Sequence, residues 1–444
     1  MIKDIRGLPV TAASNEAAAT LDHAIVGYLS YRSDLPARVE TMLASDPNFA
    51  MAHIFKGYLA MLAYKKAVLP MAAAALAAAA PLLTGATARE QAHGKALGCW
   101  IDGHPDMAAA IWREILHDHP FDVLAFRLHH FVNFWFGRPD VMLEAVLSVE
   151  KHWSGAVPGY NAILGCRCFA HEESGNYTEA EAAGREAIHR DPTDLWSAHG
   201  VAHVLEMTGR RDEGIAWIEA LQSNWTEGNN LKHHLWWHQA MFHLERGDFS
   251  RVLDLYDHRF RDLTAPLVVA APDVYIDVQN AASMLFRLRR HGIDAGGRWV
   301  ELADQAEARI GDCQSAFTLP HWMMALAASG RDEAAKAMLA GMRDYAQMPG
   351  INARLVADVA LPVCEAVLAH GTGQHARAVD LMRPVLGEMY RLGGSHAQQD
   401  VLEQLFLDSA LKAGLGGDVQ TLMERVSTRH PLPPTQRRGY ATAG

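Results

Sequence analysis

The sequence has no lysine- or arginine-rich run, and its charge balance is acidic. Forty Lys and Arg residues against 51 Asp and Glu residues give a formal net charge of −11, and the pI is near 6.1. Nucleic acids and anionic membranes attract proteins with a basic excess, so we expect neither partner. The N-terminus also lacks the apolar core and cleavage site of a signal peptide, so we expect a cytoplasmic protein.

Several patterns that would identify a class of enzyme or fold are absent. The five cysteines form neither a disulfide framework nor a CxxC zinc motif. No GxSxG elbow indicates a serine hydrolase, no glycine-rich loop indicates a nucleotide enzyme, and no HExxH motif is present. Function must therefore be inferred from less familiar residue patterns.

Signals for β-strands and membrane spans are also scarce. Only "APLVVAAPDVYIDV", residues 265–278, is rich in β-branched residues, and its prolines predict a loop entering a helix. The most apolar run, "VLPMAAAALAAAAPLL", is mostly alanine and is bounded by Pro70 and Pro81. It falls short of the ~20 strongly apolar residues of a span, which favours a packed alanine-rich helix.

A repeat of helical hairpins runs through much of the chain. Turn glycines recur at separations of 34, 38, 34 and 38 residues, at Gly103, Gly137, Gly175, Gly209 and Gly247. This period and the alanine spacing of residues 177–190 are typical of tetratricopeptide hairpins. The predicted fold is all-α, a tetratricopeptide-like α-solenoid of antiparallel helix pairs curled around an interior pocket. We expect one domain over residues 1–430 and a loose, proline-rich tail over residues 431–444.

Three separated helices each carry histidine and carboxylate side chains on one face, because positions i, i+4 and i+7 stack along a helix. The segments are "HGVAHVLE" with His199, His203 and Glu206, "HLWWHQAMFHLE" with His234 and His238, and "HAQQDVLE" with His396 and Asp400. Apolar residues flank the first two stripes on most sides, which predicts burial. Unpartnered, each buried polar group would cost about 1–3 kcal/mol, so we expect them to meet one another, water or a ligand.

These residue types leave three interpretations open. A buried histidine is often only a hydrogen-bonded core residue. A divalent metal ion could bind at His199, His203 and His238, because HxxxH places two imidazoles side by side. A metal-free acid–base site would use His203 or His238 as base, with Glu206 and Asp400 as orienting carboxylates.

The candidate catalytic residues are therefore His199, His203, Glu206, His234, His238, His396 and Asp400. Trp237 is the predicted pocket wall, and Ser395 is a predicted helix cap. Weaker substrate-binding candidates are His130 and His321, which lie on first helices of other repeats, and Asn280.

Five strings together resemble the tetratricopeptide repeat protein 38 family, and the resemblance runs from about residue 20 to 415. They are "PGYNAILGCRCFAHEESGNYTEAE", "HGVAHVLEMTGRRDEGIAWIE", "HLWWHQAMFHLERGDFSRVLDLYD", "NAASMLFRL" and "GGSHAQQDVLEQLFLDSALKAG". The resemblance implies a helical-repeat fold and a soluble intracellular protein, and it implies no particular reaction. Asn280 stands where the resemblance leads us to expect aspartate, which would change the charge of the pocket.

The function that these observations favour is binding of a small molecule in the interior pocket, with hydrolase- or lyase-type acid–base chemistry. The alternative is a non-enzymatic scaffold that binds a peptide or protein partner on its concave face. Exposure distinguishes the two, because a scaffold would present the polar stripes on an open groove. A homodimer is compatible with either function.

Overall fold

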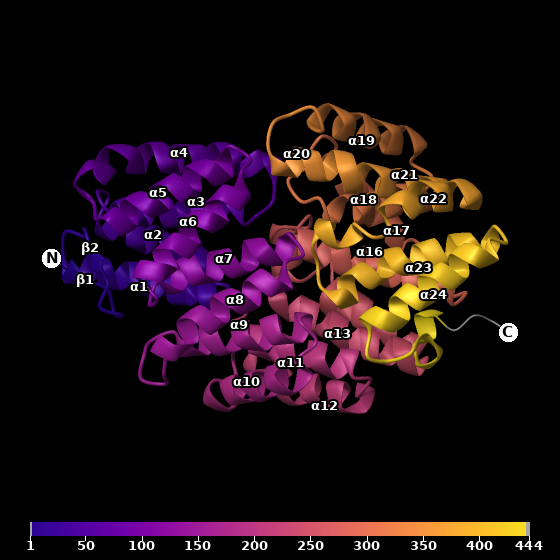
Figure 1. The fold of residues 1–444 in the computed structure, drawn as a ribbon, viewed down its shortest axis with the longest axis horizontal. Helices are drawn as coiled ribbons and strands as arrows, with labels where there is room; N and C mark the ends of the chain where they lie inside the picture. Colours follow the sequence, from indigo (N-terminus) through magenta and orange to yellow (C-terminus); the bar gives the residue numbers. More distant parts are fainter. Residues whose placement is uncertain (1, 441–444) are drawn as a thin grey trace. The chain divides into compact units, whose positions relative to one another are not determined.

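The computed structural model describes residues 2–440, and it confirms the all-α prediction (Figure 1). The strands in the described chain are β1 Ile2–Lys3 and β2 Pro9–Val10, an antiparallel pair with Ile2 opposite Val10. By its internal contacts the chain divides into two compact units. The first comprises residues 1–201 and 221–231, and the second comprises residues 202–220 and 232–444.

The helices follow one another with short connections along the whole described chain. The α-helices that begin in the first unit are α1 Asn15–Leu29, α2 Leu35–Ser45, α3 Ala50–Met61, α4 Leu69–Ala79, α5 Ala88–Ile101, α6 Pro105–Asp118, α7 Val123–Trp135, α8 Pro139–Val149, α9 Tyr160–Glu173, α10 Tyr177–Arg190, α11 Leu195–Met207 and α13 Leu231–Arg246. Those that begin in the second unit are α12 Arg211–Leu221, α14 Phe249–Leu255, α15 Pro266–Ala270, α16 Tyr275–Arg290, α17 Arg298–Ala308, α18 Thr318–Ala328, α19 Asp332–Tyr345, α20 Ile351–Leu355, α21 Leu361–Gly371, α22 His375–Met382, α23 His396–Lys412 and α24 Gly416–Arg429. Short 3-10 helices are η1 Lys66–Val68, η2 Ala80–Gly85, η3 Glu150–His152, η4 Gln222–Asn224, η7 Arg383–Val385, η8 Met389–Leu392, η9 Pro434–Gln436 and η10 Arg438–Tyr440, and η5 Tyr256–Phe260 and η6 Val356–Ala360 are π-helical.

The turn glycines separate the two helices of a hairpin, as the repeat predicts. All five have positive φ: Gly103 82°, Gly137 62°, Gly175 79°, Gly209 72° and Gly247 83°. Glycine enters this left-handed region without the steric cost that other residues meet. In the first unit, α9 packs against α10 and α5 packs against α6. The predicted helix over residues 177–190 is α10.

Close helix packing in the first unit also depends on glycine. A Cβ added at Gly184 on α10 would lie 2.5 Å from Cγ2 of Val201 and 2.8 Å from Sγ of Cys168. Alanines 180, 183 and 187 are buried on the same helix. Small residues at these positions let the backbones approach, which is why the pattern is visible in the sequence.

In the second unit, α23 packs against α16, α22 and α24. Ser395 caps α23 in a reciprocal capping box with Gln398, as predicted. Residues 265–278 contain the short helix α15 and then enter α16, as expected for a segment without a strand.

The C-terminal segment is not the loose tail that its proline content predicts. Within residues 431–440, η9 and η10 form short turns, and Tyr440 is 1% exposed. The hydroxyl of Tyr440 donates to Oδ1 of Asp400 at 2.6 Å. A buried carboxylate therefore holds a segment that composition alone predicts to be solvated, and residues 441–444 lie outside the described chain.

The alanine-rich helix differs from its prediction in one respect. Residues 66–85 do have the length and composition of a membrane span, and 17% of their most apolar stretch is buried. Ala72, Ala75 and Ala79 form the buried face of α4, which packs against α3. One such helix is weak evidence for a membrane span, because core helices of water-soluble folds meet the same criteria.

Candidate functional site

Three histidines from two helices meet inside the second unit. His203 on α11 and His234 and His238 on α13 each offer a ring nitrogen, and these atoms lie within 4.8 Å of one another. The ring centroids of His203 and His238 are 4.4 Å apart, and those of His234 and His238 are 4.8 Å apart. All three side chains are buried. We call these three residues the histidine cluster.

Hydrogen bonds from two other helix positions hold the rings of the cluster. Nδ1 of His238 is hydrogen-bonded to Oε2 of Glu206 at 2.7 Å. Nδ1 of His234 is hydrogen-bonded to Oδ1 of Asn280, on α16, at 2.8 Å. Because Nδ1 is engaged in both rings, Nε2 is the nitrogen that can serve as a ligand or a base.

Trp237 packs against two rings of the cluster. Its ring is parallel to that of His234, with 5.1 Å between centroids and 9° between planes, and it meets His238 edge-on at 4.9 Å. The guanidinium of Arg287 lies 5.8 Å from the Trp237 ring centroid. Nε1 of Trp237 has no hydrogen-bond partner within residues 2–440.

Burial keeps the imidazoles of the cluster neutral. It lowers the pKa of His238 to about 3 and holds the pKa values of His203 and His234 well below the ordinary value, and neighbouring histidines lower those two further. Burial raises the pKa of Glu206 to about 8, against the opposing effect of Arg287. Neutral imidazoles are the form that binds metal ions.

A small cavity adjoins Glu206. Its volume is about 40 Å³, and its lining includes Glu206, His396 and Asp400. This is room for a few water molecules and is far below the ~300–1,000 Å³ of a typical organic-ligand pocket. At this position the structure has a space that suits an ion and water, which is smaller than the small-molecule pocket that we expected.

Asp400 has partners other than the histidine that we expected it to orient. Its Oδ1 accepts from Tyr440 and from Arg437, and its Oδ2 accepts from Gln404 at 2.6 Å. Arg287 lies 3.5 Å from Oδ2. Burial would raise the pKa of Asp400, but Arg437 and Arg287 outweigh it and lower the pKa to about 2. Asp400 is thus an ionised anchor for the C-terminal segment.

His396, His321 and His130 each have different neighbours. His396 begins α23 and lines the small cavity. The ring of His321 on α18 is held by its own backbone, with Nδ1 2.8 Å from the carbonyl oxygen of Phe317. His130 lies in the first unit, between the rings of Phe126, Phe169 and Trp196. His199 precedes His203 by one turn on α11, and the boundary between the two units falls between them.

Sequence reasoning missed the arginines of the second unit. Arg287 is fully buried on α16, and Arg437 and Tyr440 reach Asp400 from the C-terminal segment. The signal for Arg287 was present, because it is the charged residue in the apolar stretch from 281 to 288. Arg437 had no such signal, since its segment is polar and rich in proline.

Chemically, the cluster offers three neutral nitrogen ligands with an oxygen-bearing residue behind two of them. Three histidines with a fourth position left for water form one of the recurrent ligand sets of catalytic zinc sites. The second-shell hydrogen bonds orient such ligands and tune the bound ion. The scaffold interpretation predicted exposed stripes, whereas these side chains are buried and hydrogen-bonded at 2.7–2.8 Å.

Two of the strings that carry the family resemblance lie on helices that contribute to this site. "HLWWHQAMFHLERGDFSRVLDLYD" spans α13 and α14, and "NAASMLFRL" lies on α16. No protein-family model matches the chain.

Proposed function

We propose that the second unit binds a first-row divalent transition metal ion through His203, His234 and His238. The mutual approach of their ligand atoms, within 4.8 Å, carries this proposal. A zinc–nitrogen bond is about 2.0–2.1 Å long, so small side-chain rotations would bring the three nitrogens onto one ion. Nitrogen-only ligands suit zinc, copper, nickel or iron better than magnesium or calcium.

The residues behind the ligands support a metal site over a plain histidine core. Glu206 and Asn280 engage Nδ1 of His238 and His234, which is the arrangement that usually orients metal-bound imidazoles. The small cavity that adjoins Glu206 has room for water beside the residue that holds His238. Burial removes the water that would otherwise hydrate the imidazole nitrogens of the cluster. A bound cation and its water would replace that hydration.

Hydrolysis is the reaction class that a metal ion here would support, and a substrate larger than a few water molecules would require the cavity to open. A bound divalent ion lowers the pKa of its water and polarises an oxygen of the substrate. In this proposal Glu206 holds His238 in position and Trp237 forms a wall. Elimination by the same acid–base groups is the alternative reaction class.

Metal analysis of protein purified without chelators tests the proposal. We expect close to one equivalent of zinc, copper, nickel or iron per chain, and loss of that metal in His203→Ala, His234→Ala and His238→Ala. The matched control is His243→Ala, because His243 lies on α13 and pairs with Asp248 outside the cluster. Circular dichroism spectra should show that each variant keeps its helical content.

Two results would count against the metal site. One is wild-type protein that contains no metal and does not bind added zinc in equilibrium dialysis. The other is unchanged metal content in all three cluster variants. Hydrolytic activity that persists in metal-free protein would instead favour the metal-free acid–base site.

Several broader expectations belong to the same proposal. The tetratricopeptide repeat protein 38 family remains our proposed family, on the strength of the five strings. A small-molecule ligand, a cytoplasmic location, the absence of nucleic-acid and membrane partners, and a homodimer are also proposals. Size-exclusion chromatography with light scattering would test the last of these.

A further inference from the structure

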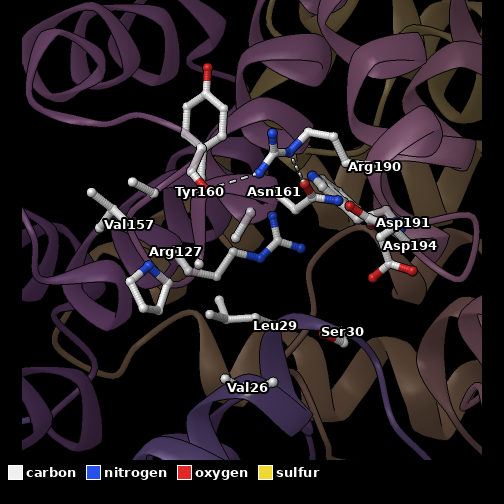
Figure 2. A pocket seen from close by; sticks show the side chains of 16 residues that line it. Val26, Leu29, Ser30, Arg127, Val157, Tyr160, Asn161, Arg190, Asp191 and Asp194 are labelled. Carbon is white, nitrogen blue, oxygen red and sulfur yellow. Dashed lines mark hydrogen bonds between the residues drawn. The ribbon is translucent and has the colours of Figure 1, made fainter. Parts of the chain in front are cut away.

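A cavity in the first unit is lined by the buried side chain of Arg127 and has a volume of about 430 Å³. This volume is within the range of small-molecule sites. Its walls come from α1, from residues 155–159 and the start of α9, and from α7 and α11. We call it the Arg127 cavity. Figure 2 shows Arg127 in the middle of the labelled lining residues.

Arg127 is a buried cation without a carboxylate on its guanidinium. Its side chain is on α7 and is 2% exposed, and it forms no ion pair with any residue from 2 to 440. Nη1 donates to Sγ of Cys166 at 3.2 Å, and Nη2 donates to the hydroxyl of Tyr31. Removing a guanidinium from water without an anion costs free energy, and thiol and phenol partners offset little of that cost.

Aromatic rings position this guanidinium. It lies 4.1 Å from the Trp196 ring centroid, and the Tyr31 ring stacks on Trp196 with 5.9 Å between centroids. Tyr31 has φ 52°, a conformation that costs a non-glycine residue free energy. Cation–π stacking holds the plane of an arginine while leaving N–H groups free to point elsewhere.

The two carboxylates that also line the cavity are engaged by backbone and hydroxyl donors. Oδ1 of Asp194 accepts from the backbone N–H groups of Trp196 and Ser197, and its Oδ2 accepts from Oγ of Ser197 at 2.8 Å. Oδ1 of Asp191 accepts from the backbone and hydroxyl of Thr193. Asp194 therefore caps α11 and moderates the charge of Arg127 only from beyond ion-pair distance.

A second guanidinium lies at the rim. Nε of Arg190 donates to Oδ1 of Asn161 at 3.1 Å, and Nη2 donates to the carbonyl oxygen of Gly155 at 3.2 Å. A Cβ at Gly155 would lie 2.7 Å from Nη1 of Arg190, so glycine permits this approach. Like Arg127, Arg190 forms no ion pair within residues 2–440. The rest of the lining is largely apolar, with Val26, Leu29, Val157, Pro158 and Ala162.

We propose that the Arg127 cavity binds a small organic oxyanion with an apolar body, its carboxylate or phosphate paired with Arg127 and its body against Trp196, Leu29 and Val157. The bidentate fork of arginine matches both oxyanions. Arg190 at the rim adds a second positive charge. This site is independent of the proposed metal centre.

Ligand-induced thermal shifts and calorimetry on the full chain test the site, with phenylacetate and phenyl phosphate as probes at constant ionic strength. The neutral control is phenylacetamide, which has nearly the same shape as phenylacetate. We expect saturable stabilisation by at least one oxyanion and none by the amide. Stabilisation by one oxyanion alone identifies the carboxylate or the phosphate as the class that the cavity takes.

Variants locate the binding. Arg127→Met should weaken oxyanion binding at least about tenfold, and Arg113→Met, the same change on α6 outside the cavity, should not. Arg190→Ala, at an exposed position, should weaken it several-fold and provides the test if Arg127→Met does not fold. Equal effects of phenylacetate and phenylacetamide would overturn the proposal, and so would the absence of saturable binding of either oxyanion up to about 10 mM. Wild-type affinity in both arginine variants would also overturn it.

Discussion

Oε2 of Glu206 and Nδ1 of His238 lie 2.7 Å apart, although Glu206 lies in the last turn of α11 and His238 lies in the middle of α13. Both groups are buried, and burial raises the pKa of the acid to about 8 while it lowers the pKa of the imidazole to about 3. Both groups are therefore neutral near pH 7 and hydrogen-bonded to each other. In our proposal a metal ion binds Nε2 of His238.

Glu206→Gln should weaken metal binding by about tenfold or more, the usual loss when a group behind a ligating histidine is changed. Glutamine has almost the shape of glutamate but lacks the ionisable oxygen, so the fold should be kept. Competition with a chromogenic zinc chelator measures the affinity. Glu219→Gln, on the neighbouring helix α12, is the matched control. Equal zinc affinity in Glu206→Gln and wild type would remove Glu206 from the site.

Asn280→Asp should strengthen metal binding, on the order of tenfold. A carboxylate at Oδ1 would raise the basicity of His234, and the bound cation would compensate the added charge. The metal-free variant should unfold at lower temperature than wild type, because an extra buried charge then has no partner. Asn280→Ala should change the affinity in the opposite direction. Both measurements use the same chelator competition, and a fall in affinity for both variants would contradict the prediction.

Tyr440→Phe should lower the free energy of unfolding by about 1–2 kcal/mol. The change removes the hydroxyl that donates to Oδ1 of Asp400 at 2.6 Å and leaves a buried acceptor with one partner fewer. Urea denaturation followed by circular dichroism measures the loss. Tyr390→Phe, at a position that is 37% exposed, should change stability by less than about 0.5 kcal/mol. Equal effects of the two changes would mean that the C-terminal segment is not anchored at Asp400.

Acid should destabilise wild type more steeply than Asp400→Asn between about pH 4 and pH 2. The pKa of Asp400 falls from 3.8 to about 2 on folding, so its ionised form stabilises the folded chain above pH 4. That contribution, about 2 kcal/mol, is lost as pH falls through the folded pKa. Unfolding curves of both proteins at each pH measure the difference in slope. Parallel pH profiles would show that Asp400 titrates normally.

The hairpin architecture could be predicted from the sequence because its causes are local. Gly103, Gly175 and Gly247 occupy left-handed turns, and the small residues of 177–190 form the buried face of one helix. These features depend on dihedral preference and on the 3.6-residue period. The pairing of His234 with His238 on one helical face is local in the same sense.

The tertiary structure alone decided which remote groups meet. Glu206 on α11 is hydrogen-bonded to His238 on α13. Asp400 also lies on one helical face with a histidine, but its partners are Arg437, Arg287 and Tyr440. Helical periodicity predicts which face of a helix carries a side chain. Which residue that side chain contacts depends on how helices distant in the sequence pack, and on which charged groups are buried together. For the same reason a buried arginine such as Arg127 gave no sign of its cavity in the sequence, since its isolation from carboxylates is a property of packing.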